Sequence, residues 1–450
     1  MAFVPGLCDV FADPRNIFRQ KFKAKRLSPT GRGGAFAAAG AGAHREEEMK
    51  RICLFAAAAT LFAAPALAED TITIGFTASQ TGPLNVDSLG QQRGYEFWRD
   101  EVNASGGIKV AGKSYHVNFV SYDDQSVGGR VQQLYTRLVV QDKADFLFSP
   151  YSSGLTAPAT VISEQYGKVM IVSGGAEEKP FMLGNKHLFM VITSAGHYLS
   201  GAVEALKAKN PQAKIAMVYS DDPFSKTVLA SAAQQAKDLG LDIVLNESYA
   251  PSTTDFGPIV NKIISSNADA FLGGGHYSDG ATLARQMYDQ KADMKWVSIL
   301  VAPADDKFGE LGAPAMGVTV PSQWEIQVSY KPQFGPTTAE FAKAFQAKFN
   351  AKPDYHSASG YTSGVILQHA IEQAGSIDPE KVTEALNTID VTTFFGHIKF
   401  ATDPGHHGLQ TAHEMVLAQW QKVDGKPGRQ VVWPAAAQSA NLIYPISASQ

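Results

Sequence analysis

The sequence has very little cysteine, because Cys8 and Cys53 are the only two in 450 residues. Both precede the cleavage site predicted below, so we expect no disulfide, reactive thiol or cysteine-based metal site in the rest of the chain. An excess of positive charge is also missing, since the formal net charge is −4. This argues against a nucleic-acid partner. Long apolar runs are confined to the region near residue 55, which argues against a multi-pass membrane protein.

Signatures of catalysis are weak. The G-x-S-x-G pattern of a serine nucleophile is not found, and Gly360–Gly364 places Thr362 at its centre. His406, His407 and His413 lack the H-E-x-x-H spacing of a zinc site. We expect neither a phosphate-binding loop nor a dinucleotide fingerprint. The sequence therefore predicts no catalytic residues, no metal, no cofactor and no enzymatic activity.

Residues 49–68 are typical of a secretory signal peptide. Lys50 and Arg51 follow Met49, residues 52–64 form a 13-residue apolar run, and Ala66-Leu67-Ala68 is a small-residue cleavage site. The alternative is a buried core helix. We interpret residues 1–48 as a non-native or disordered extension and expect translation to begin at Met49. Removing the ten basic and five acidic residues of 1–68 from the 39 and 43 of the chain leaves a net charge of −9.

The remaining chain alternates strand and helix patterns. Apolar alternation or short apolar runs predict strands, and apolar residues at helical spacing predict helices between them. Two successive β-α-β series of this kind predict an α/β fold with two doubly wound, parallel-sheet lobes. The predicted strands are 71–76, 115–122, 144–148, 169–172, 214–219, 242–245, 268–272 and 296–300, and the predicted helices are 90–102, 131–141, 158–166, 225–239, 256–265 and 279–288.

Small, hydroxyl and aromatic residues follow the predicted strands. In open α/β sheets ligands bind beyond the carboxyl ends of the strands. Hydroxyls, free backbone amides and rings at those ends suit a small carboxylate with an apolar body. Taken singly, these residues have plainer explanations, namely a tight turn at Gly273–Gly275, a helix cap at Ser152-Ser153 and a surface loop at His276. The candidate ligand-binding residues are Gln80, Tyr151, Ser152, Ser153, Gly174, Gly175, Ala176, Phe224, His276, Tyr277 and Val301.

Three motifs carry a resemblance to a known family. They are Ser79-x-Thr81-Gly82-Pro83, then Asn103-Ala104-Ser105-Gly106-Gly107-Ile108, and then Tyr122-Asp123-Asp124-Gln125. With the signal peptide, this chain resembles periplasmic solute-binding proteins of ABC transporters, of the leucine/isoleucine/valine-binding type. The resemblance implies a type I periplasmic binding protein, with an N-lobe (69–193 and 325–395), a C-lobe (194–324 and 396–434) and a tail (435–450). It further implies a three-crossing hinge that closes around the ligand.

The resemblance also implies roles for single residues. Ser153 matches the hydroxyl that binds a ligand carboxylate, and Gly174 and Ala176 match positions whose backbone groups bind the ligand. Phe224 matches an aromatic position of the second lobe, and His276 or Tyr277 matches the ring that closes over the ligand. Tyr361 falls near a tyrosine of the family.

One position departs from the family. Amino-acid binders of this family place an acidic residue where our alignment puts Val301, and that residue pairs with the ligand ammonium. Asp305 could replace it only if the loop shifts. Burying a ligand ammonium without a carboxylate partner is costly, so the ligand could also be one that lacks an α-ammonium. Besides hydrophobic amino acids, the candidate ligands are therefore an aromatic carboxylate, another apolar carboxylate or a small amide.

The function implied is that of a monomeric periplasmic receptor, free of a lipid anchor. It would capture a small-molecule ligand, a hydrophobic amino acid or an aromatic acid, and deliver it to an ABC permease in the inner membrane. One alternative is a ligand sensor for a signalling partner on the same scaffold. A secreted hydrolase is a third possibility, and it lacks a visible activated nucleophile.

Overall fold

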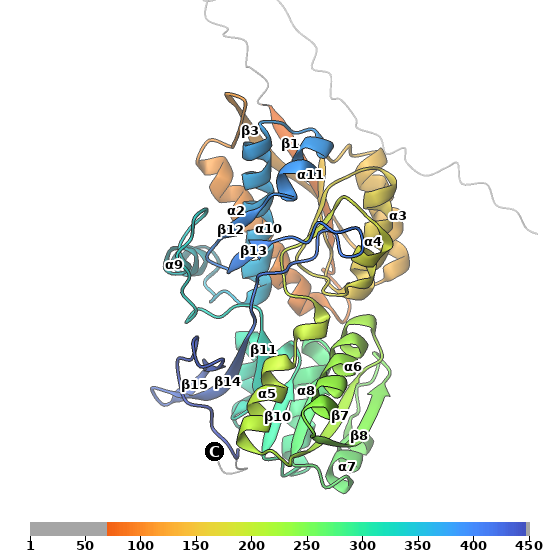
Figure 1. Cartoon of the computed structure of the whole chain (residues 1–450), viewed down its shortest axis with the longest axis vertical. Coiled ribbons are helices and arrows are strands. Elements are labelled where there is room, and N and C mark those ends of the chain that lie inside the picture. Colours follow the sequence, from red (N-terminus) through yellow and green to blue (C-terminus); the bar gives the residue numbers. More distant parts are fainter. Residues whose placement is uncertain (1–69, 447–450) are drawn as a thin grey trace, which may run out of the picture. The chain divides into compact units, whose positions relative to one another are not determined.

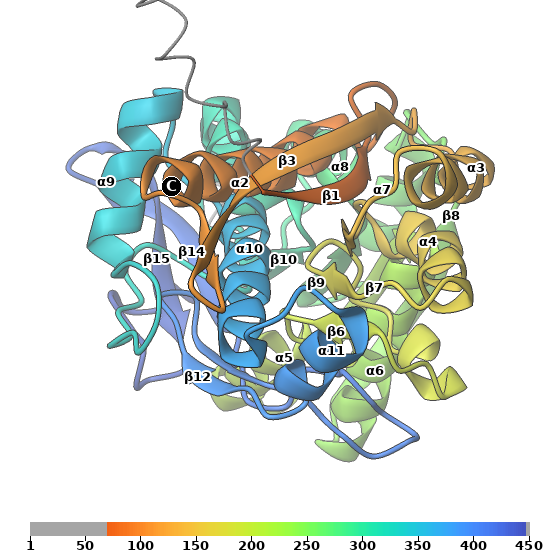
Figure 2. The ribbon, with the colours of Figure 1, turned by 90° about the horizontal axis from the view of Figure 1, so that it is seen from above.

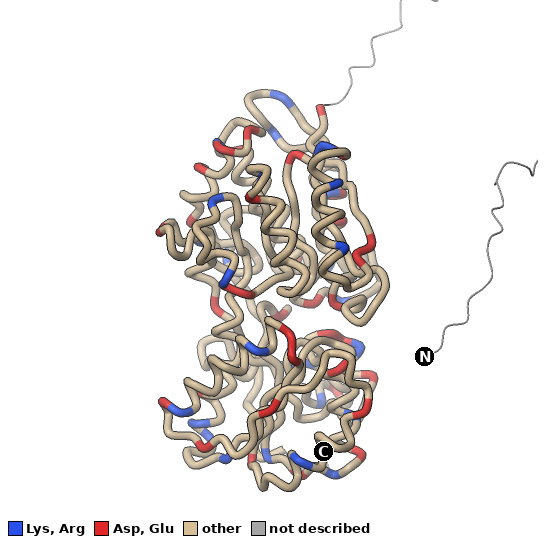
Figure 3. Tube along the Cα trace, turned by 90° about the vertical axis from the view of Figure 1, so that its right-hand side faces the viewer, with Lys and Arg blue, Asp and Glu red and all other residues tan. Residues whose placement is uncertain are grey.

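The computed structural model describes residues 70–446. The predicted extension (1–48) and signal peptide (49–68) lie outside the described residues. Among the helices that are described, none is long and apolar enough to cross a membrane. Acidic and basic residues are interspersed along the chain trace (Figure 3).

The first sheet has six strands in the order β2-β3-β1-β4-β5-β6. All neighbours in it are parallel except β2 and β3, which form an antiparallel hairpin at one edge. Its strands are β1 (Thr71–Ala78), β2 (Ile108–Val110), β3 (Lys113–Asp123), β4 (Phe146–Phe148), β5 (Met170–Val172) and β6 (Leu188–Met190).

Helices cover both faces of this sheet. On one face the ring of Phe76 in β1 packs edge-on against Tyr95 of α2, and α2 packs along α10 (Figure 2). On the other face Gly75 lies against Leu138 of α3, which packs on α4. The helices, which with the first sheet we call the first lobe, are α2 (Asn85–Ala104), α3 (Gly128–Val140), α4 (Ser153–Gln165), α10 (Tyr355–Ala374) and α11 (Pro379–Leu386).

The second sheet has seven strands in the order β15-β14-β11-β10-β9-β7-β8. Its β11, β10, β9, β7 and β8 are parallel, whereas β14 and β15 extend it as antiparallel strands. The strands are β7 (Lys214–Ser220), β8 (Asp242–Tyr249), β9 (Ala270–Gly274), β10 (Trp296–Ile299), β11 (Thr319–Ser322), β14 (Val416–Val423) and β15 (Lys426–Trp433).

Helices pack on both faces of the second sheet, and together with it they are called the second lobe (Figure 1). Ile215 of β7 joins a core with Val203 of α5 and Val228 of α6. The next residue, Ala216, joins a separate core with Val260 of α7 and Leu283 of α8. Alternate residues of one strand thus point to opposite faces of the sheet and pack into two separate cores, as expected for a doubly wound sheet with helices on both faces. The helices are α5 (Ser200–Lys209), α6 (Pro223–Asp238), α7 (Gly257–Ser265) and α8 (Tyr277–Asp289).

The chain passes between the two lobes three times. It leaves the first sheet after β6, returns after β11 to form α9 (Thr338–Phe349), α10 and α11, and enters the second sheet again at β14. Before that last passage come the short strands β12 (Asp390–Thr392) and β13 (His397–Lys399). The carbonyl of Gly408 still accepts a hydrogen bond from the Met190 N–H of β6. The exact lobe boundaries given above stay a prediction.

The predicted α/β fold with parallel-dominated sheets is confirmed, but some elements begin elsewhere than predicted. Helix α4 begins at Ser153 rather than at Pro158, which lies inside it. Pro158 is the sixth residue of this helix, so it lacks the N–H that would donate to the Gly154 carbonyl, and the helix continues past it despite that loss. Helix α7 begins after Phe256, while Asp255 accepts from the Gly257 N–H at 2.9 Å.

The segment Gly107–Ser114 has the G-x-x-x-x-G-K-S spacing of a phosphate-binding loop, although we expected no such loop. In the structure this segment forms the β2–β3 hairpin, with Ile108 paired to Tyr115. A phosphate-binding loop needs a strand before it and a helix N-terminus after it. Neither flanks this segment in that order, so the match carries no nucleotide site.

Candidate functional site

A small cavity lies where the two lobes meet. The space open to the centre of a water molecule is about 10 Å³, close to the room that one water needs. Among the described residues that line it there is no Asp, Glu, Lys or Arg. The lining consists of Tyr151, Ser152, Ser153, Ser173, Gly174, Ala176, Ile192, Tyr198, Phe224, His276, Val301, Tyr355 and His356.

The first turns of four helices supply much of this lining. Ser153 begins α4, Phe224 is the second residue of α6, His276 is the N-cap of α8, and Tyr355 and His356 begin α10. Helix N-termini carry partial positive charge and unpaired N–H groups. An anionic group in this cavity is therefore favoured by the dipoles of four helices.

Local sequence explains why two of these helices begin here. Asp222 caps α6 by accepting from the Ser225 N–H at 3.0 Å, and Pro223 follows at the first helical position. Asp354 caps α10 by accepting from the Ser357 N–H at 2.7 Å. Aspartate at the N-cap and proline at the first helical position both favour a helix start. Each cap aims the ring residues that follow it at the cavity.

The Ser153 hydroxyl is oriented by the backbone. Its Oγ accepts from the N–H groups of Ala176, at 3.0 Å, and Glu177, at 3.2 Å. A hydroxyl oxygen has two lone pairs and one proton, so the proton remains to bind an acceptor. The Gly174 N–H donates to Ser149 Oγ at 3.1 Å. Serine hydroxyls thus take the N–H groups of both Gly174 and Ala176 in this arrangement, and ligand binding by backbone groups of these two residues stays a prediction.

Aromatic contacts link the two lobes across the cavity. Tyr151 Oη lies 2.8 Å from His276 Nδ1, and the His276 ring stacks on Phe224 with centroids 5.8 Å apart. The Tyr151 ring also meets the edge of His356 at 5.1 Å, and Tyr198 meets Phe224 at 5.0 Å. The cavity thus has an almost continuous aromatic wall.

Three carboxylates lie behind this wall. Asp87 of α2 is buried and accepts from the Tyr277 N–H of the second lobe at 3.2 Å, and burial raises its pKa to about 7. Burial and the nearby charge of Asp354 also raise the pKa of Asp305. Asp222 Oδ2 lies 3.8 Å from His276 Nε2. None of these three aspartates lines the cavity. They therefore act on a group inside it through the electric field of their charges rather than by direct contact.

Three of the candidate residues do not line the cavity. Gln80 is exposed, and its N–H donates to Asp123. A Cβ at Gly175 would lie 2.5 Å from Thr156 Oγ1, so this glycine serves close packing. Tyr277 begins α8 and binds Asp87 through its N–H. The other eight candidates do line it, namely Tyr151, Ser152, Ser153, Gly174, Ala176, Phe224, His276 and Val301.

Val301 occupies the place given to it by the alignment. It is buried at the cavity wall, with φ of 55° and ψ of −63°. This is the centre of a γ-turn, in which the Ala302 N–H donates to the Leu300 carbonyl at 2.6 Å, and it is a rare and strained conformation. Asp305 is also buried, and its carboxylate accepts from the Lys307 N–H at 2.8 Å. Within the described lining, then, nothing replaces the missing acid.

Sequence reasoning missed five lining residues: Ser173, Ile192, Tyr198, Tyr355 and His356. The Pro353-Asp354 pair was a usable signal for the last two, because it marks a helix start. Tyr361, which the resemblance places near a tyrosine of the family, lies about one and a half turns further along α10. Its hydroxyl donates to Glu101 at 2.6 Å, and its ring packs on Phe97.

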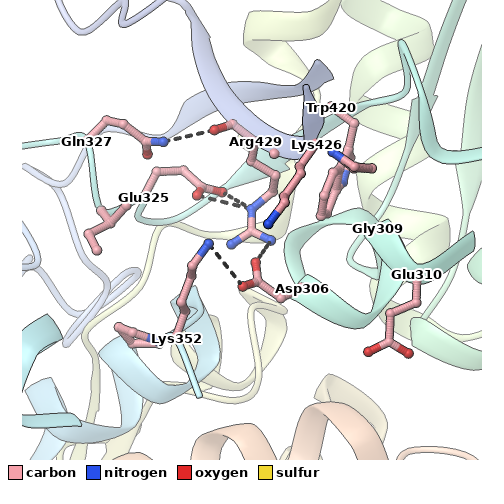
Figure 4. Close-up of a pocket in the computed structure, with 13 residues that line it drawn as sticks. Asp306, Gly309, Glu310, Glu325, Gln327, Lys352, Trp420, Lys426 and Arg429 are labelled. Carbon is pink, nitrogen blue, oxygen red and sulfur yellow. Dashed lines mark hydrogen bonds and ion pairs between the residues drawn. The ribbon is translucent and has the colours of Figure 1, made fainter. Parts of the chain in front are cut away.

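A second cavity of about 330 Å³ lies beside β15 (Figure 4). Arg429 Nε is 3.1 Å from both carboxylate oxygens of Glu325, and Arg429 Nη1 is 2.7 Å from Asp306. Lys352 Nζ reaches the other oxygen of Asp306 at 3.9 Å. These four charges pair with one another, so an ion-pair network forms one wall of this cavity.

Relatives of this chain are named as binding proteins. It is 25% identical over 414 residues to "Leu/Ile/Val-binding protein homolog 7" of Brucella melitensis, which covers 88% of this chain and all of that protein. It is 28% identical over 337 residues to an "Amino acid binding protein" of Pseudomonas aeruginosa, covering 72% of this chain and 84% of the relative.

Solved structures share its fold. A branched-chain amino acid transporter substrate-binding protein from Streptococcus pneumoniae, in complex with isoleucine, matches with a TM-score of 0.68 and 22% identity over 81% of this chain and all of the other. A solute-binding protein of an ABC transporter from R. palustris, in complex with benzoate, matches with a TM-score of 0.69 and 18% identity. That match covers 80% of this chain and 96% of the other. Residues 71–426 match the periplasmic binding protein family, and this chain therefore belongs to that family.

Proposed function

We propose that this protein is the periplasmic receptor of an ABC importer and that its ligand is a small aromatic or similarly apolar carboxylate without an α-ammonium group. The observation that carries the proposal is the lining of the cavity between the lobes. It combines hydroxyls and rings at four helix N-termini with no charged side chain among the described lining residues.

The carboxylate would bind at Ser153. The Ser153 oxygen is held by two backbone N–H groups, so its proton is free for an acceptor. Four helix N-termini add favourable electrostatics. The cavity as closed here has room for about one water, so the lobes would have to close less tightly over a ligand. The aromatic rings, with Ile192 and Val301, would then enclose its apolar body.

The absence of an acid from the lining disfavours an amino acid. An α-ammonium enclosed here would face the Val301 side chain, while the Asp305 carboxylate is bound to its own backbone loop. An unpaired buried charge costs several kcal/mol. The relatives named as amino-acid binders keep a hydrophobic amino acid as the second candidate, which requires that the 301–305 loop rearrange.

The mode of action follows from the two lobes. Ligand contacts residues of both lobes, so it stabilises the closed arrangement by its differential affinity. The closed form would then engage an inner-membrane permease as a monomer, after export through the predicted signal peptide.

A binding panel tests the proposal. The purified protein is titrated calorimetrically with benzoate, 3-phenylpropionate, leucine, phenylalanine and benzamide at pH 7. We expect binding of the carboxylates without an ammonium and little or none of the two amino acids. Binding of leucine or phenylalanine alone would overturn the ligand assignment, and binding of benzamide alone would show that the cavity selects neutral amides.

A further inference from the structure

His356 is a buried polar side chain without a hydrogen-bond partner. It is 2% exposed and lines the cavity. Within the described residues, neither Nδ1 nor Nε2 makes a hydrogen bond. Buried polar groups in proteins are almost always paired, so a histidine with two free nitrogens facing a ligand cavity requires an explanation.

The surroundings of His356 rule out a partner from its neighbours. Its ring lies 5.1 Å from the ring of Tyr151, edge to face, and 4.0 Å from that of Tyr355. These are ring contacts, and the Tyr151 hydroxyl is already bound to His276 Nδ1. The Asp354 cap fixes the backbone at His356, and the rings of Tyr151 and Tyr355 pack against its imidazole, which lines the cavity where a ligand would enter.

We propose that His356 determines ligand specificity by hydrogen bonding to a second polar group of the ligand, a ring hydroxyl carried in addition to the carboxylate. This inference rests on the proposed function and narrows its ligand class to hydroxylated aromatic carboxylates.

The chemistry of the two groups matches. A neutral imidazole offers one donor and one acceptor, and a phenolic hydroxyl is also both donor and acceptor. Burial lowers the pKa of His356 to about 4, so the ring is neutral near pH 7 and can play either role. A ligand with an unsubstituted ring would leave both nitrogens unpaired, which costs affinity.

The test compares ligand ratios in matched variants. Calorimetric dissociation constants are measured for benzoate, 3-hydroxybenzoate, 4-hydroxybenzoate and 4-methylbenzoate, the last controlling for size. The proteins are the wild type, His356→Phe, which keeps a ring of similar size without polar atoms, and His356→Gln, which keeps a donor and an acceptor. Melting temperatures without ligand check that each variant is folded.

We expect the wild type to bind one hydroxybenzoate about tenfold or more tighter than benzoate. In His356→Phe that ratio should fall to about one while benzoate affinity is retained, and His356→Gln should restore part of it. A hydroxyl preference that is equal in the wild type and His356→Phe, or missing from the wild type, overturns the role of His356 but leaves the proposed function standing. Failure of every aromatic carboxylate to bind the wild type overturns the proposed function itself. If His356→Phe does not fold, the wild-type ratio and its change in His356→Gln decide.

Discussion

The hydroxyl of Tyr151 in the first lobe lies 2.8 Å from Nδ1 of His276 in the second. Tyr151 follows β4 and His276 caps α8, so this hydrogen bond exists only when the lobes are closed. It links the stability of the closed state to two residues that also line the ligand cavity.

Tyr151→Phe should therefore weaken ligand binding without unfolding the protein. Loss of one hydrogen bond costs about 0.5–1.5 kcal/mol, or roughly a two- to tenfold rise in the dissociation constant. Calorimetric titration with the carboxylate of the panel that binds most tightly measures this change in the dissociation constant. Tyr166→Phe is the control, since Tyr166 is an exposed residue of the same lobe. Equal affinities in the two variants would show that the contact does not contribute to closure.

Binding of a carboxylate should strengthen as the pH falls from about 8 to about 6. Asp87 is buried against Tyr277 of the second lobe, and burial raises its pKa to about 7. We expect an opened, hydrated Asp87 to keep its ordinary pKa, so closure takes up a proton. The contribution of this group to stability is fully present below its ordinary pKa near 4 and is lost as the pH rises through 7. Calorimetry across this range measures the trend.

Asp87→Asn is the matched variant for this pH dependence. Its amide oxygen can still accept from the Tyr277 N–H, but the group no longer titrates. The pH profile should flatten, and affinity at pH 8 should rise. An unchanged slope in this variant would assign the dependence to Asp305 or to another group.

Ser153→Ala should reduce carboxylate affinity by about 1–3 kcal/mol, the cost of losing a buried hydrogen-bond partner. Ser149→Ala is a close control, because Ser149 Oγ also accepts two backbone N–H groups, those of Ser173 and Gly174, but does not line the cavity. Both variants should lose similar thermal stability, and only Ser153→Ala should show a large further loss in titration. Equal losses of affinity would reduce Ser153 to a structural role.

Val301→Asp should introduce binding of hydrophobic amino acids. The new carboxylate would stand at the cavity wall where an α-ammonium lacks a partner. Val301→Asn has nearly the same shape without the charge and serves as control. Calorimetric titration with leucine should show binding to the aspartate variant alone. Failure of Val301→Asp to bind leucine would contradict the role of Val301 in excluding amino acids.

Arg429→Met should destabilise the protein by about 3–5 kcal/mol, because it leaves the carboxylate of Glu325 buried without its cation. Lys352→Met should cost under about 1 kcal/mol, since this lysine is largely exposed and its ion pair is long. Urea denaturation of both variants measures the difference. Similar losses would show that the network acts as a unit.

Much of the fold could be predicted from the sequence, because it depends on local patterns. Apolar runs such as 169–172 predict strands, and the glycine that follows a helix, as at Gly240, predicts its end. These patterns repeat twice, which predicts two parallel sheets. The edge strands and the helix starts were harder to predict from the sequence. The sheet positions of β2, β14 and β15 depend on contacts with residues far away in the chain.

The candidate site divides in the same way. Position after a strand led to Ser153 and Gly174, since parallel strands end at one edge of a sheet, whereas Val301 came from the resemblance to a known family. Gln80 satisfies the same rule, but the tertiary structure turns it toward Asp123 and solvent.

Only the tertiary structure decided that His356, about two hundred residues after Ser153, faces the same cavity with both nitrogens free. The physical reason is that α10 packs on α2 of the first lobe after the chain has already built the second. A contact formed by that return is not encoded in any local pattern, whereas the strand ends and helix caps are.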